Sequence, residues 1–126
     1  NQKNQYTEAL LKPEKIITPQ YIKKSEEYML EKASEPITLQ DVANHAGISL
    51  KTLHTGFQKY RNDSPKNFLK NLRLDLVKRD LTAARLEKSN ATVTDVALHW
   101  GFLHLSHFSE SYYAKFGEYP STTLKG

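Results

Sequence analysis

The chain has no cysteine, and it has only five glycines and five prolines among 126 residues. Without thiols it can form neither disulfides nor thiolate metal sites, which fits the reducing cytoplasm in which we expect it. No stretch has the length and apolarity of a membrane span, and none resembles a signal peptide. The sequence also lacks a Gly-rich phosphate loop and a recognisable nucleophile with its acid-base partner. We therefore expect neither an enzyme nor a cofactor.

The remaining composition, 38% hydrophobic and 25% charged, is ordinary for a single soluble domain. A formal net charge of +4 and a pI near 9.2 give a mild basic excess, as in many domains that bind nucleic acid. The sequence begins at Asn1 without an initiator Met, and its single methionine is Met29. We therefore expect a fragment of a longer protein.

One ten-residue segment occurs twice, beginning at Thr38 and again at Thr92, and the copies share Thr, Asp, Val, Ala, His and Gly. In each copy the Thr and the Asp three residues later have the form of a capping box that opens a short helix. Gly47 and Gly101 stand where a left-handed residue ends such a helix. A second helix follows each glycine. This pattern predicts two helix-turn-helix units, whose second helices can enter a DNA major groove.

Residues 1–18 are polar and interrupted by Pro13, so they are expected to be an interdomain linker or the remnant of a missing N-terminal region, with one helical turn at 9–12 at most. A domain of residues 19–126 follows. Apolar periodicity predicts helices over 20–33, 50–60 and 65–84, and a last short helix from Pro120. The side chains expected on the inner faces are Leu50, Leu53 and Phe57, then Phe68, Leu69, Leu72, Leu76 and Leu81, and finally Leu105, Phe108, Tyr112 and Phe116.

Two repeats around one long helix are too few for a solenoid, which usually needs three or more. The sequence predicts an all-α fold with helix-turn-helix units at about 38–61 and 92–116, joined by a linker helix at about 65–84. A helix of about 20 residues is roughly 30 Å long. Because major-groove faces one turn apart are separated by roughly 34 Å, one monomer can read two successive grooves.

Four segments carry a resemblance to a known family: LQDVANHAGISLKTLHTGF from Leu39, SPKNFLKNLRL from Ser64, VTDVALHWGF from Val93 and LSHFSESYYAKFGEYPS from Leu105. Over residues 19–126 the sequence resembles the DNA-binding domain of the AraC/XylS family of bacterial transcription regulators. The resemblance implies seven helices, double-stranded DNA and RNA polymerase as partners, and an additional N-terminal domain that binds an effector or dimerises.

The sequence departs from the family pattern at several positions. Arg61-Asn62 replaces a common Thr-Gly, and Asn tolerates the same left-handed turn. Gly56, inside the first recognition helix, costs about 1 kcal/mol relative to Ala and is interpreted as a close helix contact. His104 is a poor N-cap for the second recognition helix. Glu110 replaces a frequent Arg on a face expected to meet a polyanion.

Helical-wheel positions opposite the apolar faces predict the DNA contacts. The candidate base contacts are Lys51, His54, Thr55, Ser106, Ser109 and Glu110, and by the resemblance all of these except Ser109 match family positions that face bases. The candidate phosphate contacts are Thr38, Ser49, Gln58, Lys59, Arg61, His104, Tyr113 and Lys115. The alternative is that these are solvated surface residues. The duplicated motif favours DNA contact.

Two other clusters favour plainer interpretations. A basic run on the linker helix consists of Lys66, Lys70, Arg73, Lys78 and Arg79, and we expect a solvated face with Asp75 and Asp80 as local partners, DNA contact being the lesser alternative. The five histidines are His45, His54, His99, His104 and His107, and no carboxylate or thiolate stands at ligand spacing from them. His107 is expected to be structural, next to a core Phe, and His45 and His99 to contact phosphate or water. No metal site is predicted.

The sequence thus indicates a sequence-specific DNA-binding domain of a bacterial transcription regulator. The alternative is a protein-interaction module that uses the same helices to contact RNA polymerase or another regulator, with DNA binding secondary.

Overall fold

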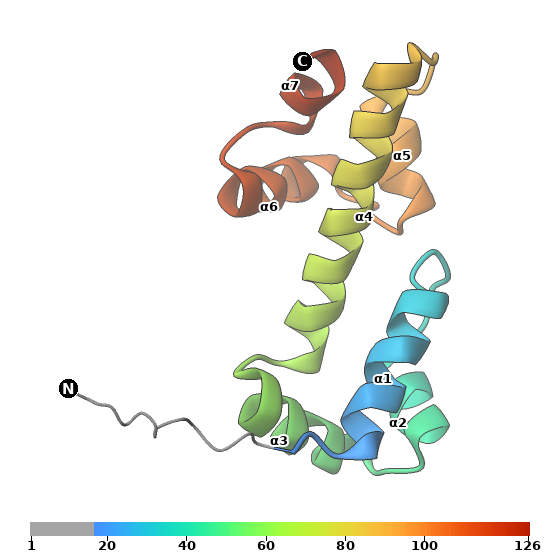
Figure 1. The fold of residues 1–126 in the computed structure, drawn as a ribbon, viewed down its shortest axis with the longest axis vertical. Coiled ribbons are helices and arrows are strands. Elements are labelled where there is room, and N and C mark those ends of the chain that lie inside the picture. Colours follow the sequence, from blue (N-terminus) through green and yellow to red (C-terminus); the bar gives the residue numbers. More distant parts are fainter. Residues whose placement is uncertain (1–16) are drawn as a thin grey trace, which may run out of the picture.

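The computed structural model describes residues 17–126, and every regular element in this range is helical (Figure 1). The predicted all-α fold of seven helices is confirmed. The expected linker over 1–18 lies outside the described residues except for its last two positions. The helices are α1 (Gln20–Glu31), α2 (Leu39–Ala46), α3 (Leu50–Arg61), α4 (Pro65–Glu87), α5 (Val93–His99), α6 (Leu105–Phe116) and α7 (Pro120–Lys125).

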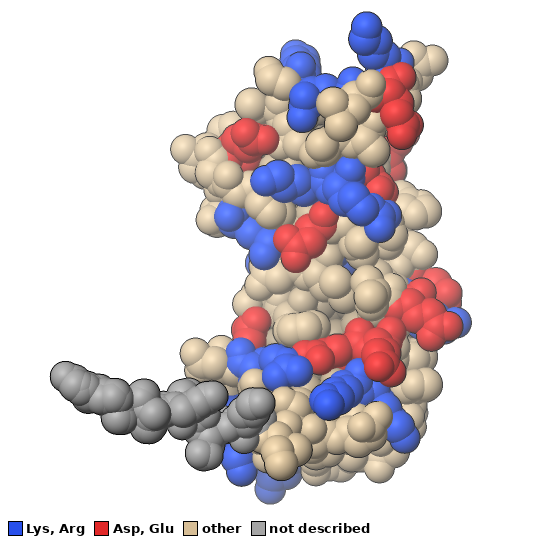
Figure 2. All heavy atoms as spheres, in the orientation of Figure 1, with Lys and Arg blue, Asp and Glu red and all other residues tan. Residues whose placement is uncertain are grey.

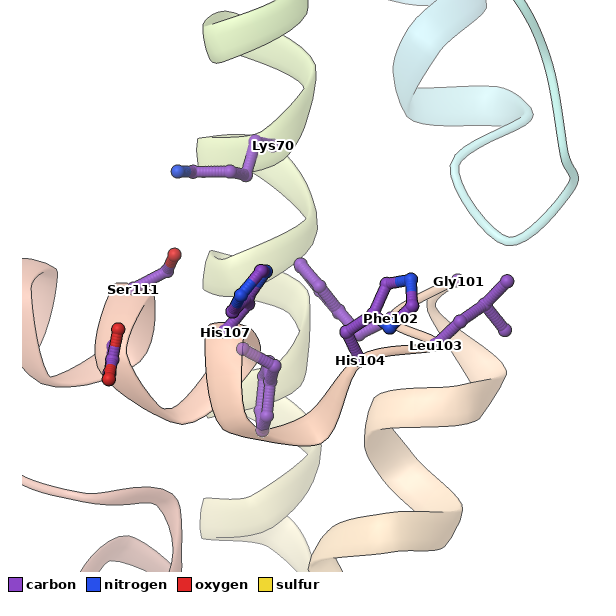
Figure 3. A pocket seen from close by; sticks show the side chains of 9 residues that line it. Lys70, Gly101, Phe102, Leu103, His104, His107 and Ser111 are labelled. Carbon is purple, nitrogen blue, oxygen red and sulfur yellow. The ribbon is translucent and has the colours of Figure 1, made fainter.

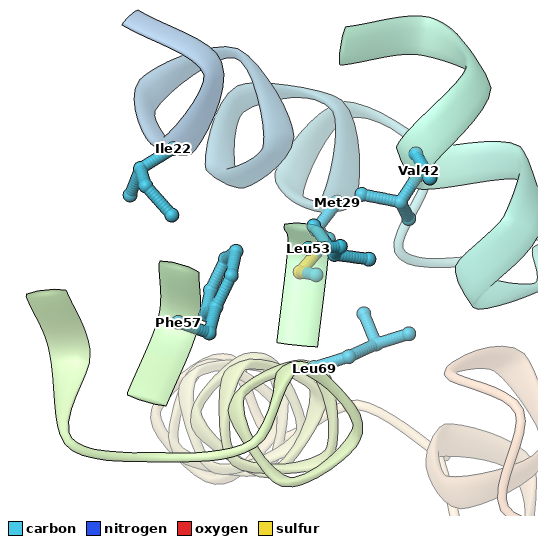
Figure 4. Close-up of a cluster of buried hydrophobic side chains, with 7 residues drawn as sticks. Ile22, Met29, Val42, Leu53, Phe57 and Leu69 are labelled. Atoms are coloured by element: carbon cyan, nitrogen blue, oxygen red, sulfur yellow. The ribbon is translucent and has the colours of Figure 1, made fainter. Parts of the chain in front are cut away.

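Two hydrophobic clusters pack along α4, one on its first part up to Leu72 and the other from Leu74 onward, and Figure 1 shows the helices that surround each part. The first unit, α1 to α3, surrounds the start of α4, and its cluster is shown in Figure 4: Ile22, Met29, Val42, Ala43, Leu53, Phe57 and Leu69. The second unit, α5 to α7, surrounds the second half of α4 with a cluster of Leu74, Val77, Leu81, Val96, Ala97, Phe108 and Tyr112. The long helix therefore belongs to both cores.

The single apolar side predicted for α4 is wrong. Phe68, Leu69 and Leu72 face the first cluster, whereas the sequence pattern overlooked Leu74 and Val77, which are buried in the second. At about 100° per residue these two groups lie on nearly opposite sides of the helix. The apolar stripe changes sides because each unit packs on a different face, and no single helical period describes it.

Two further positions expected on inner faces are exposed. Leu50 keeps 36% and Leu105 keeps 37% of its surface accessible, while Leu53, Phe57 and Phe108 are buried as predicted. Both leucines are the first residue of their helix. Side chains in a helix lean toward its N-terminus, so a residue in the first position projects past the packed core.

The first repeated segment forms the expected capping box, whereas the second forms only its threonine half. The Thr38 hydroxyl accepts from the Asp41 amide at 3.0 Å, and the Asp41 carboxylate accepts from the Thr38 amide at 2.9 Å. In the second copy the Thr92 hydroxyl accepts from the Asp95 amide at 3.1 Å. Gly47, with a φ of 74°, is the C-cap of α2, whereas Gly101, with a φ of 91°, follows Trp100, the C-cap of α5. The angle at which each second helix leaves its turn is set by its glycine.

Gly56 is a close helix contact, as the sequence indicated. A Cβ atom at this position would lie 2.6 Å from the hydroxyl oxygen and 2.7 Å from the Cε1 of Tyr21, a residue of α1. The Tyr21 side chain is itself packed against the first hydrophobic cluster. A larger residue at 56 must therefore displace the ring from that packing.

We predict that Gly56→Ala stabilises the chain less when Tyr21 is present than in a Tyr21→Ala background. Alanine in a helix interior is favoured over glycine by about 1 kcal/mol, and displacement of the ring opposes this gain. Urea unfolding of the four members of this double-mutant cycle should give a coupling free energy of about 1 kcal/mol or more. Strictly additive effects would show that the ring moves away without cost.

Candidate nucleic-acid interface

The exposed face of α3 is the first part of the candidate interface. Ser49 caps this helix, since its hydroxyl oxygen accepts from the Thr52 amide at 3.0 Å. Leu53 and Phe57 are buried and orient the helix. The opposite stripe is exposed and consists of Lys51, His54, Thr55 and Gln58. The structure thus places the three candidate base contacts of α3 side by side on solvent-facing positions.

Thr55 is held in a fixed rotamer by its own helix. Its hydroxyl donates to the carbonyl of Lys51 at 3.0 Å. The oxygen lone pairs and the methyl group of Thr55 stay exposed. They suit acceptance from a base donor or apolar contact with a thymine methyl group.

The candidate phosphate contacts of the first unit differ in whether their polar groups already bind other groups of the protein. Thr38 and Ser49 use their hydroxyls as N-caps. Lys59 is exposed and lies 5.2 Å from the centre of the Tyr60 ring. Arg61 instead binds Glu26 of α1 through two nitrogens and donates to the Tyr60 carbonyl at 3.1 Å. Lys59 is therefore the better placed cation for a phosphate.

The pair of Arg61 and Glu26 joins the end of α3 to α1. The hydrogen bond from the guanidinium to the Glu26 carboxylate raises the pKa of Arg61, against the opposing effect of burial. Both side chains are largely shielded, at 30% and 23% exposure. The charge of Arg61 is thus largely compensated by Glu26 within the protein.

The exposed face of α6 forms the second part of the candidate interface. Phe108 and Tyr112 are buried, whereas Ser106, Glu110 and Tyr113 are exposed and Ser109 is half-buried. The Tyr113 ring lies 4.6 Å from that of Tyr119. Lys115 forms an ion pair with Asp75 of α4 at 3.5 Å. The outer stripe of α6 is therefore polar, with the Glu110 carboxylate as its one full charge.

The beginning of α6 faces α4 across a pocket of about 480 Å³ (Figure 3). Its polar lining consists of Lys70, His104, His107, Glu110 and Ser111. The His104 side chain makes no capping hydrogen bond, as expected. The structural role predicted for His107 is wrong. This side chain is exposed, because a step of about 100° from Phe108 turns it away from the core.

The basic run on α4 is only in part a solvated face. Arg79 binds its neighbour Asp80 at 3.0 Å, as expected, and Lys78 lies 4.6 Å from the centre of the Phe116 ring. Arg73 departs from the expectation, because its guanidinium donates to the carbonyls of Ala33 at 2.9 Å and Glu35 at 2.8 Å. Burial lowers the pKa of Arg73. Lys66 and Lys70 remain exposed.

His45 stacks on an aromatic ring, and His99 makes an edge-to-face contact with another. His45 lies 4.5 Å from Tyr28, and His99 lies 4.7 Å from Trp100, measured between ring centroids. Within residues 17–126 no three His, Asp or Glu side chains are grouped so that they could hold a metal ion. None of the described helices is long and apolar enough to cross a membrane.

Two polar contacts of α4 have no signature in the sequence. The indole of Trp100 donates to the Asp80 carboxylate at 2.7 Å, which ties the end of α5 to α4. The other is the pair of bonds from Arg73 to backbone carbonyls.

Acidic and basic side chains alternate over the face drawn in Figure 2, so the basic excess does not form one continuous patch in that view.

Comparisons with known proteins agree with this architecture. A family model described as a helix-turn-helix domain matches residues 42–126. The XylDLEGF operon transcriptional activator 1 of Pseudomonas putida is 36% identical over 102 residues, which cover 79% of this chain and 29% of that protein. This chain spans roughly a third of the length of several curated relatives that it matches.

Solved structures show the same fold. A probable AraC family transcriptional regulator from Rhodopseudomonas palustris superimposes with a TM-score of 0.78 at 34% identity, covering 85% of this chain and 96% of that one. The DNA-binding domain of AdpA, solved with a target DNA, superimposes with a TM-score of 0.69 at 21% identity, covering 82% and 88%. With a family model matched over residues 42–126, two capped helix-turn-helix units and these neighbours, the chain belongs to the AraC/XylS family of helix-turn-helix transcription regulators.

Proposed function

We propose that this chain binds double-stranded DNA by placing α3 and α6 in successive major grooves. One observation carries the proposal: the second helix of each helix-turn-helix unit is exposed, and both units pack on one continuous 23-residue helix. That helix is about 35 Å long, which gives one chain the reach of two major-groove faces roughly 34 Å apart. The AdpA domain, which shares this fold, was solved in complex with a target DNA, and this supports DNA as the ligand in the proposal.

In this proposal α3 and α6 contact DNA with different kinds of side chain. On α3, Lys51, His54 and Thr55 face base edges and Lys59 faces phosphate. On α6, Ser106, Ser109 and Glu110 face bases, with His104 and Tyr113 at the backbone. The remaining predicted phosphate ligands are Thr38, Ser49, Gln58, Arg61 and Lys115, of which Arg61 and Lys115 must share their charge with Glu26 and Asp75.

The whole protein to which this chain belongs is proposed to be a cytoplasmic activator of transcription, like the Pseudomonas putida relative by its name. Contact with RNA polymerase and an N-terminal domain that binds an effector or dimerises complete this proposal. One observation favours the alternative of a protein-interaction module: Leu98 and Leu103 are 48% and 75% exposed next to the second unit's turn.

Selection of duplexes from a random pool in gel-shift experiments separates these functions. DNA reading should yield sites with two short blocks whose centres lie about 10 base pairs apart. A pool that stays random after selection would favour the interaction module.

We expect the affinity for a selected duplex to fall steeply with salt. Lysines that neutralise phosphates release condensed counterions, so log affinity should decrease linearly with log salt, with a slope of about −0.9 per phosphate contact. Fluorescence anisotropy between low and moderate salt measures this slope. A flat response would sink the proposal that DNA is the ligand.

Substitutions on α3 should separate base reading from phosphate binding. His54→Ala or Thr55→Ala should relax preference within one block by about 1 to 3 kcal/mol, because a base-edge contact is lost. Lys59→Ala should weaken binding to all sequences alike and reduce the salt slope by about 1. Binding to a panel of single-base variants of the site measures both effects. The same uniform loss for all three variants would mean that α3 does not read bases.

Glu110 should create a preference for cytosine in the second block. A carboxylate near phosphates is repelled, and its useful base partner is the exocyclic amino group of cytosine. Glu110→Ala should therefore lose about 1 to 3 kcal/mol of discrimination at one cytosine.

Glu87→Ala is the matched control, since it removes the same charge from an exposed position at the end of α4. It should leave base preference unchanged. Uniformly tighter binding of Glu110→Ala to all duplexes would contradict base reading and show that the carboxylate, which shares its pocket with Lys70, only lowers affinity.

A further inference from the structure

Arg73 lies where both units meet α4. Its neighbour Leu72 packs against the first cluster, and its other neighbour Leu74 belongs to the second. The two carbonyls that accept from Arg73, those of Ala33 and Glu35, stand in the loop between α1 and α2. One side chain of the linker helix therefore holds a loop of the first unit.

The same guanidinium lies beside the turn of the second unit. A Cβ atom at Gly101 would be 3.7 Å from both the Cζ and the Nη1 of Arg73, which is van der Waals distance. Arg73, Ile37 and Gly101 together line two cavities of about 360 and 400 Å³. Figure 2 shows a narrow waist between the two units in this part of the molecule. Packing between the units is open here, and Arg73 occupies the junction.

Arg73 holds the first unit at a point on α4 that lies some distance from the main packing contacts of that unit. The first unit packs on the beginning of α4, through Pro65, Phe68, Leu69 and Leu72. Arg73 lies eight residues beyond Pro65, or about 12 Å along the axis. A tilt of the first unit by about 10° about these packing contacts would move a group about 12 Å away by about 2 Å. That displacement is more than half of one base-pair step of about 3.4 Å.

We propose that Arg73 is a positioning residue that fixes the tilt of the first helix-turn-helix unit on α4 and thereby sets the spacing between the two DNA blocks that one chain recognises. This inference rests on the proposed DNA-binding function. The planar guanidinium suits the role because its fork of donors reaches two carbonyls at once, which a lysine ammonium on a flexible stem does less rigidly.

A panel of duplexes tests the inference. Each duplex carries the two selected blocks, with one base pair removed, none changed, or one or two added between them, and a further duplex carries the first block alone. Arg73→Gln should lower the preference for the best spacing by roughly fivefold or more, the low end of the effect of one mismatched base pair. Its affinity for the single-block duplex should change by less than about twofold, because α3 itself is untouched.

Two further variants complete the comparison. Arg79→Gln removes the same charge from the same helix, where Arg79 binds its neighbour Asp80 and lies 5.8 Å from the centre of the Trp100 ring without contacting the first unit, and it should keep the spacing preference. Arg73→Lys retains the charge and should lose part of the preference, and it serves in place of Arg73→Gln if that variant does not fold. Equal loss of affinity at every spacing, or an unchanged preference in both Arg73 variants, would overturn the proposal.

A second measurement needs no DNA. Because the chain has no cysteine, spin labels can be attached at Lys24→Cys on α1 and Thr94→Cys on α5, both exposed and away from the proposed interface. The distance distribution between them should broaden in Arg73→Gln and remain narrow in Arg79→Gln. An unchanged distance distribution in Arg73→Gln would contradict the proposal that Arg73 fixes the tilt of the first unit. Failure of the wild-type chain to select any DNA site would instead contradict the proposed function and leave this result standing.

Discussion

The structure depends on the burial of two nearly opposite faces of one helix. Leu69 completes the first cluster, and Leu74, Val77 and Leu81 form one wall of the second. Burial of each such side chain contributes about 1.5 to 3 kcal/mol, and without α4 both small units would expose these surfaces. The helix thus contributes side chains to both cores and also separates the two units. Because it is continuous across residues 72–74, it connects the two units without a break.

The two copies of the motif share their main turn residues but differ in their electrostatics. Both have a threonine N-cap on the first helix and a glycine with positive φ before the second. The stripe on α3 contains Lys51, with Lys59 at the end of the helix, whereas α6 contains Glu110 and a Lys115 bound to Asp75. In the proposed complex with DNA, the lysines of α3 would add affinity. Glu110 on α6 would add selectivity, because a carboxylate is favourable only opposite a suitable donor.

Local features of the fold could be predicted from the sequence because their causes are local. Caps, the Gly47 turn and the buried positions of α3 each depend on residues within one or two turns. The two faces of α4 could not be predicted, because they depend on where distant units dock. Arg73 was missed for a related reason: its partners are backbone carbonyls, which have no side-chain signature. Which exposed residues of the candidate site contact DNA depends on a partner that the chain alone does not contain.

The arginines bind acceptors within the protein, whereas several lysines are exposed on its surface. All four arginines bind acceptors within the protein: Arg61 at Glu26, Arg73 at two loop carbonyls, Arg79 at Asp80 and Arg85 at the Thr123 carbonyl. A rigid fork of donors suits such fixed acceptors. Lys51, Lys59, Lys66 and Lys70 are exposed, and a hydrated ammonium on a flexible stem suits phosphates. In the proposed complex the arginines would therefore set the shape that DNA meets, and these four lysines would supply the long-range attraction to it.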